Sequence, residues 1–173
     1  GFTLWSDVIR KSPRKARGYI NRGRLYAQEG DFAQAARDFS AALRIAPEHP
    51  AAHFNLGKIR FLQKKFDSAM HHFEQSLIQG EQTSLVPVIY MYRGRVREAQ
   101  NDYTRAVFEY SNAITRDSGY GAAYVHRGRV YFILGSEQKG FSDLNKARSL
   151  GYELSRDEAA RLRALITKKR REK

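Results

Sequence analysis

The sequence contains no cysteine among its 173 residues. Without thiols, the chain can form no disulfide, no thiolate metal site and no cysteine nucleophile, although its redox compartment stays open. It also lacks any run that approaches the roughly 18 consecutive apolar residues of a spanning helix, and it shows no signal-peptide pattern. We therefore expect that no part of this segment inserts into a membrane.

Acidic residues are scarce beside basic ones, since 18 Asp and Glu stand against 31 Lys and Arg, a net charge of +13. The excess lies mostly in residues 1–15 and 121–173, while residues 16–120 are nearly balanced. A basic end such as "KKRREK" is typical of a solvated helix terminus and less often forms a phosphate-binding arm. Because 42% of the residues are apolar, the chain can bury the core of one domain or one stack of small repeats.

The tripeptide Arg-Gly-Arg occurs three times, and a related Leu-Gly-Lys occurs once. The central glycines are separated by 34, 37 and 34 residues, and they are Gly23, Gly57, Gly94 and Gly128. Spacing of this length favours a structural repeat over an arginine-glycine tail or chance. We number each unit so that its glycine is position 8, which makes residues 16, 50, 87 and 121 the first positions of four units.

Other positions of the unit also recur. Position 20 is small (Ala35, Ala69, Ala106, Gly140), and position 24 is large (Phe39, Phe73, Tyr110, Leu144). Positions 4, 8 and 11 share one face of a first helix, and positions 20, 24 and 27 share one face of a second. Large side chains would fill the space between the two helices, and small ones would lie where the backbones approach. One hairpin cannot cover its own apolar faces, so successive hairpins must stack.

This pattern resembles the tetratricopeptide repeat, which has aromatics at positions 4, 11 and 24, Gly at 8, Ala at 20 and 27 and Pro at 32. The resemblance covers residues 16–151 and implies an all-α, right-handed superhelical solenoid of antiparallel helix hairpins. Repeats are predicted at 16–49, 50–86 (with a longer loop at 80–87), 87–120 and 121–151. Residues 1–15 are expected to be the second helix of an incomplete preceding repeat, and residues 152–173 a basic capping helix that opens with a Ser155–Glu158 capping box. Turn or cap signals separate the helices at 29–31, 65–67, 100–102 and 134–136.

The N-terminal segment "LWSDVIRKSPRKAR" is similar to the linker that opens repeat domains attached to multi-spanning membrane proteins related to glycosyltransferases. The first residue is Gly rather than Met, so we expect a processed or excised piece of a longer protein. The resemblance implies a parent chain with a membrane part, and in that case a location outside the cytoplasm. A cytoplasmic location is the other option.

Positions 7 and 23 vary together among the units. Arginine at position 7 accompanies an acid at position 23 in three units, whereas the second unit has Leu56 and His72 there. The co-variation predicts ion pairs between the two helices of a hairpin: Arg22–Asp38, Arg93–Glu109 and Arg127–Asp143. The alternative is that these charges are exposed and unpaired.

Position 9 is basic in every unit and shares a helix face with an apolar position 5. In the tetratricopeptide family this face lines a concave groove that binds peptides. The resemblance therefore implies a groove that is basic along one side and apolar along the other. The predicted peptide-binding residues are Ile20, Asn21, Arg24, Phe54, Asn55, Lys58, Met91, Arg95, Val125, His126 and Arg129. The alternative for each position-9 cation is a solvated surface residue.

The sequence contains no recognisable catalytic motif, because no serine lies in a nucleophile-elbow context and no phosphate loop is present. Pro50 separates His49 from His53, and the adjacent His71 and His72 point in different directions. We predict no catalytic residue, no metal site and no cofactor. The expected partner is another protein with an acidic or partly apolar segment, and self-association through open repeat ends is a further option. Nucleic-acid or anionic-surface binding is the alternative function, disfavoured because few aromatics stand beside the groove cations to stack bases.

Overall fold

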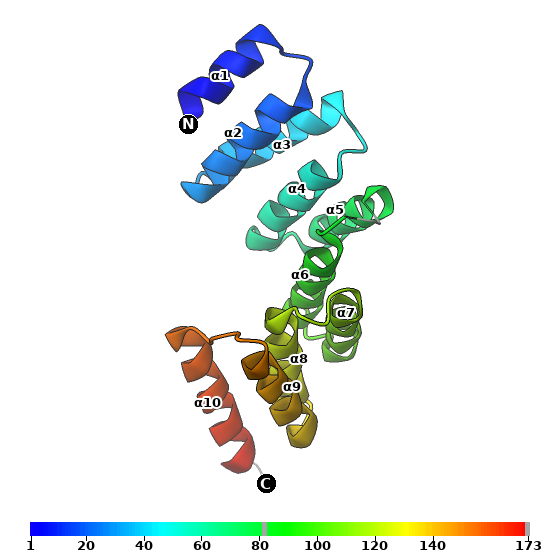
Figure 1. The fold of residues 1–173 in the computed structure, drawn as a ribbon, viewed down its shortest axis with the longest axis vertical. Coiled ribbons are helices and arrows are strands. Elements are labelled where there is room, and N and C mark those ends of the chain that lie inside the picture. Colours follow the sequence, from blue (N-terminus) through cyan, green and yellow to red (C-terminus); the bar gives the residue numbers. More distant parts are fainter. Residues whose placement is uncertain (81–82, 172–173) are drawn as a thin grey trace. The chain divides into compact units, whose positions relative to one another are not determined.

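The computed structural model describes residues 1–80 and 83–171, which form ten α-helices and no strand (Figure 1). The helices are α1 (Phe2–Lys11), α2 (Ala16–Gln28), α3 (Phe32–Ile45), α4 (Pro50–Leu62), α5 (Phe66–Gln79), α6 (Val86–Ala99), α7 (Tyr103–Arg116), α8 (Gly121–Ile133), α9 (Glu137–Ser149) and α10 (Arg156–Arg171). Residues 81–82 of the predicted longer loop and residues 172–173 of the predicted capping helix lie outside the described residues.

The chain divides into two compact units, each of which contains several of the repeats numbered above. The first unit is Gly1–Ile89 and the second is Tyr90–Lys173, with the boundary inside α6. In the first unit each helix from α1 to α4 packs against the next one in the chain. In the second unit α7 packs on α8, and α8 also contacts both α9 and α10. The fold is therefore the predicted all-α solenoid of helix hairpins. The boundaries predicted for the individual repeats stay a prediction.

The position-8 glycines lie where the two helices of a hairpin come closest. A Cβ atom built on Gly57 would lie 2.7 Å from the Phe73 ring, and one on Gly23 would lie 2.9 Å from the Phe39 ring. Both rings are fully buried, as are the position-20 alanines Ala35, Ala69 and Ala106. Real Cβ atoms do not approach a ring so closely, so a larger residue at position 8 would push the helices apart.

The fourth hairpin reaches the same close packing with different residues. Leu144 replaces the ring at position 24, and Gly128 lies instead against the backbone of Gly140, whose oxygen is 3.0 Å from a built Cβ. The ring of Phe132 covers Gly140, where a Cβ would lie 2.8 Å from it. Glycine at position 20 of this unit therefore makes room for a ring that comes from the first helix rather than the second.

The turn inside each hairpin needs a left-handed residue at position 15. Gly30, Lys64, Asn101 and Gly135 occupy this position and have φ angles of 83°, 58°, 60° and 77°. Two turns then continue with an aspartate whose side chain accepts a bond from the new helix, Asp31 from Gln34 N and Asp102 from Arg105 N. At 65–67 the order differs, because α5 begins at Phe66 and places Asp67 inside its first turn.

The capping box predicted at the start of α10 is present. The Ser155 backbone N–H donates to Glu158 at 2.9 Å, and the Glu158 N–H donates to Ser155 Oγ at 3.3 Å. Leu162 of the same helix is buried at 7% exposure. The helix is thereby anchored at its first turn and along its apolar face.

Lys64→Gly is expected to stabilise the protein, because a lysine at φ 58° is strained and Lys64 is exposed. A left-handed residue with a Cβ costs about 1–2 kcal/mol, and glycine's greater freedom in the unfolded chain offsets part of the gain. We expect a net gain of about 0.5–1 kcal/mol from urea unfolding. Gly30→Ala, at the same position of the first hairpin, should destabilise by about 1 kcal/mol. A less stable Lys64→Gly variant would contradict this account of the turn.

Candidate functional site

The three ion pairs expected from positions 7 and 23 are present. Arg22 and Asp38 are joined by two hydrogen bonds of 2.8 and 2.9 Å, and Arg127 and Asp143 by two of 2.8 Å. Both aspartates are buried, and the arginine side chains are 22% and 18% exposed. These hydrogen bonds raise the pKa of both arginines above its usual value. The co-variation of positions 7 and 23 therefore reflects a contact in the folded protein.

Each of these two arginines also reaches a serine of the preceding helix. Arg22 Nη1 donates to Ser6 Oγ at 3.3 Å, and Arg127 Nη1 donates to Ser111 Oγ at 3.0 Å. The serine lies 16 residues before the arginine in both cases. One guanidinium therefore ties together three successive helices. The equivalence of Ser6 and Ser111 supports the prediction that residues 1–15 continue the repeat pattern.

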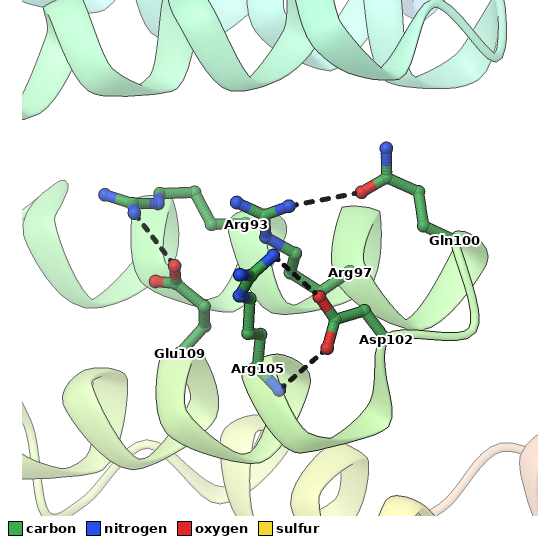
Figure 2. A network of polar contacts seen from close by, with 6 residues as sticks. All are labelled: Arg93, Arg97, Gln100, Asp102, Arg105 and Glu109. Carbon is green, nitrogen blue, oxygen red and sulfur yellow. Dashed lines mark hydrogen bonds and ion pairs between the residues drawn. The ribbon is translucent and has the colours of Figure 1, made fainter.

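The third pair, Arg93–Glu109, is weaker in geometry. A single 2.8 Å bond joins Arg93 Nη2 to Glu109 Oε1, while Glu109 Oε2 and Arg93 Nε are buried without a hydrogen-bond partner (Figure 2). Burial raises the pKa of the Glu109 carboxyl, because desolvation outweighs the attraction of Arg93. Nearby, Arg105 contacts Asp102 through its side chain and its backbone N–H, and Arg97 contacts Gln100.

The second hairpin replaces the ion pair with two histidines, an arrangement that the repeat pattern does not predict. His53 Nδ1 and His72 Nδ1 lie 3.1 Å apart, and His53 Nε2 lies 2.8 Å from the Pro47 carbonyl oxygen. Because a carbonyl can only accept, His53 Nε2 carries a hydrogen. In a neutral His53 the other nitrogen then accepts from His72 Nδ1–H. Neither histidine is the usual residue at its position of the repeat, and this shared departure was the sequence signal for their contact.

Asp143→Asn should destabilise the protein by about 3 kcal/mol, because it leaves the poorly exposed Arg127 guanidinium without a countercharge. Replacing both Arg127 and Asp143 with leucine should recover most of this loss. The matched control is Asp7→Asn in the exposed Arg10–Asp7 pair, which should cost less than about 1 kcal/mol. Urea unfolding measures all three, and equal losses for Asp143→Asn and Asp7→Asn would refute the pairing account.

Five of the six groove residues predicted in the first unit lie around one pocket of about 440 Å³. Ile20 and Arg24 come from α2, and Phe54, Asn55 and Lys58 come from α4. Arg24 is exposed, while Ile20 and Phe54 are each only 7% exposed and form the floor. The pocket is completed by Ala27, Gln28, Ala51 and Leu85, and none of the described residues that line it is acidic.

Two side chains of this pocket have defined orientations. The Lys58 ammonium lies 5.5 Å from the centroid of the Phe54 ring. The Asn55 amide donates to the Ala51 carbonyl of its own helix at 2.8 Å. The cation is therefore held above the apolar floor, where it can meet an anionic group of a bound chain. Of the groove residues predicted in the first unit, Asn21 is not among the residues that line the pocket.

The predicted groove residues of the second unit are arranged differently. Met91 and Val125 are buried at 7% and 8% exposure, and the Arg95 guanidinium lies 5.0 Å from the Tyr92 ring centroid. Arg129 forms a 2.8 Å ion pair with Glu98, and its Nη2 lies 3.1 Å from His126 Nδ1. The charge of Arg129 is thus neutralised inside the unit, unlike the charge of a cation that faces a groove.

A buried polar network explains this difference. Glu98 also accepts a 2.9 Å bond from the Tyr110 hydroxyl, and the His126 ring stacks on the Tyr110 ring at 5.4 Å. Position 12 is apolar in the other repeats, where it is Ala27, Phe61 and Phe132. The single acid at this position, Glu98, was therefore a sequence signal for a partner in the next repeat.

Stability should fall as the pH drops, because burial lowers the pKa of both His72 and His126 to about 4 from the ordinary 6.5. Between these values the unfolded state binds protons that the folded state does not, so the stabilisation is complete above pH 6.5 and is lost toward pH 4. We expect the urea midpoint to fall between pH 7 and pH 5. The double variant His72→Gln, His126→Gln should lose most of that slope, and an unchanged slope would contradict the assignment.

The part of the chain that the structure describes has no group of three or more His, Cys, Asp or Glu residues arranged to hold a metal ion. None of its helices is both long enough and apolar enough to span a membrane.

Comparison with known proteins agrees with the geometry. A tetratricopeptide repeat family model matches residues 5–82. Tetratricopeptide repeat protein 16 of Mus musculus is 30% identical over 105 residues, which cover 57% of this chain and 13% of that protein. Hsp70-Hsp90 organizing protein 3 of Arabidopsis thaliana is 26% identical over 73 residues, 42% of this chain and 13% of that protein. The crystal structure of MamA has a TM-score of 0.76 at 17% identity and covers 87% of this chain and 86% of its own.

Stacked helix hairpins with a glycine against a ring at each closest approach define a helical repeat scaffold. Residues 5–82 match the tetratricopeptide repeat family, and the fold of the chain is the helical solenoid of that family. Proteins of this family are in general scaffolds for protein–protein interaction rather than enzymes. The chain spans only 13% of the length of the two curated relatives, so it corresponds to a small part of each.

Proposed function

We propose that the chain is a protein-interaction scaffold whose first unit captures an acidic, partly apolar segment of another protein, extended or helical, without catalysing a reaction. The observation that carries the proposal is the pocket between α2 and α4. Arg24 and Lys58 supply its positive charge, and Ile20 and Phe54 supply its apolar floor.

The chemistry of the pocket determines what it can bind. Among the described residues, the pocket lining contains two cations and no acid, so these residues would attract a bound carboxylate. Ile20 and Phe54 expose little surface, so the apolar gain from the floor is small and must be supplemented by Ala27, Ala51 and Leu85. Charge should therefore contribute more to binding here than in a deep apolar groove. Association should accelerate at low salt.

The test uses a pool of 12-residue peptides that alternate acidic and apolar residues, and a matched pool in which glutamine replaces glutamate. Arg24→Glu with Lys58→Glu should weaken binding of the acidic pool at least tenfold, because two attractions become repulsions. The control Arg116→Glu with Lys146→Glu changes the net charge equally at two exposed residues and should change affinity less than twofold. Fluorescence anisotropy at constant ionic strength measures both.

Two outcomes would count against the proposal. The groove assignment fails if the control variant loses as much affinity as Arg24→Glu with Lys58→Glu. The alternative function, nucleic-acid binding through the basic terminus, predicts that a chain ending at Thr167 loses affinity for a random oligonucleotide with a steep salt dependence. The peptide proposal predicts that this truncation leaves peptide affinity unchanged.

A further inference from the structure

A second pocket, of about 540 Å³, lies between α3 and α4 in the first unit. Arg37, Ser40 and Arg44 line it from α3, and Arg60 and Gln63 line it from α4. Ala33 and Ala36 complete the wall and leave its interior open because their side chains are short. This pocket is separate from the peptide groove proposed above.

The two pockets lie on opposite faces of α4. Phe54, Asn55 and Lys58 contribute to the proposed peptide groove, while Arg60 and Gln63 contribute to the second pocket. At 100° per residue, the centres of these two sets are about 160° apart around the helix. A ligand in the second pocket therefore need not compete with a peptide in the first.

The second pocket is open because the second repeat, residues 50–86, has no arginine at position 7. At the α1–α2 and α7–α8 junctions, Arg22 and Arg127 extend from the later helix to a serine of the earlier one. At the α3–α4 junction the equivalent serine is Ser40, but position 7 is Leu56, which is buried at 3% exposure and cannot reach out to it. At the other two junctions a position-7 guanidinium enters this space. At the α3–α4 junction the space stays open, and arginines lie around its rim.

The arginines of this rim form no ion pair with the residues described. No carboxylate lines the pocket, and Arg37, Arg44 and Arg60 form none of the ion pairs found in the described part of the chain. Arg60 is instead oriented by a 3.0 Å hydrogen bond from its Nη1 to Gln63 Oε1. Three arginines thus line one pocket together with a serine and a glutamine.

The repeat pattern does not account for the three arginines together. The α7–α8 junction has Phe108, Thr115 and Tyr131 at the positions equivalent to Arg37, Arg44 and Arg60. Phe108 there is 64% exposed. Duplication of one ancestral unit would have left similar residues at both junctions, so the cluster is particular to the first unit.

We propose that the pocket between α3 and α4 binds a phosphoryl group of a ligand. A phosphoryl group carries about −1.5 to −2 charges at pH 7, and its oxygens match the bidentate fork of arginine. Three arginines are more charge than one carboxylate balances, whereas a phosphoryl or diphosphoryl group balances them closely. The Ser40 hydroxyl can donate a further hydrogen bond to an oxygen of the bound group.

Titration calorimetry of the full chain with inorganic pyrophosphate, at constant ionic strength, tests this proposal. Wild type should bind, and Arg37→Gln with Arg44→Gln should weaken binding at least tenfold. Both residues are exposed, so the variant should fold, which its circular dichroism spectrum would verify. Arg17→Gln with Arg116→Gln removes equal charge elsewhere on the surface and should stay within twofold of wild type.

Two further probes separate the sources of the group. A phosphoserine peptide that binds more tightly than pyrophosphate, with the same loss in the variant, would show that a protein carries the group, and the reverse order would indicate a small phosphate compound. The proposal is overturned if pyrophosphate does not bind, if the control loses as much affinity as the pocket variant, or if a triglutamate peptide binds as tightly as pyrophosphate.

Discussion

The contact between a first-helix glycine and a second-helix ring sets the geometry of the hairpins. Gly23 against Phe39 and Gly57 against Phe73 bring two backbones closer than any side chain at position 8 would permit. The alanines at position 20 extend that close approach along the hairpin. Once the helices are this near, positions 7 and 23 face one another, so the ion pairs between them are a consequence of the packing rather than its cause.

The residue at position 7 then determines what each junction between hairpins can do. An arginine there neutralises a buried acid and bonds to a serine of the preceding helix, as Arg22 and Arg127 do. Leu56 does neither. Its repeat has the His53–His72 contact in place of an ion pair, and a pocket stays open at the junction with Ser40 of the preceding repeat. One apolar substitution in the repeat thus creates both a pH-sensitive contact and a candidate binding site.

Features that repeat were predictable from the sequence, and features that depart from the repeat were not. The columns at positions 8, 20 and 24 predicted the all-α fold, and the co-variation of positions 7 and 23 predicted three contacts that the structure contains. The Arg129–Glu98 pair joins positions 9 and 12 of different repeats, so no comparison of columns within a hairpin could reveal it. The peptide-binding role of Arg24 and Lys58 stays a prediction.

Thermal and urea unfolding of Gly57→Ala tests the central claim most directly, because two physical effects predict opposite signs. Helix propensity alone predicts that alanine stabilises by about 0.5–1 kcal/mol. The 2.7 Å approach to Phe73 predicts instead a loss of about 1–3 kcal/mol, while Gly119→Ala in an exposed turn should change stability by less than about 0.5 kcal/mol. A Gly57→Ala protein as stable as wild type, or more so, would contradict the account.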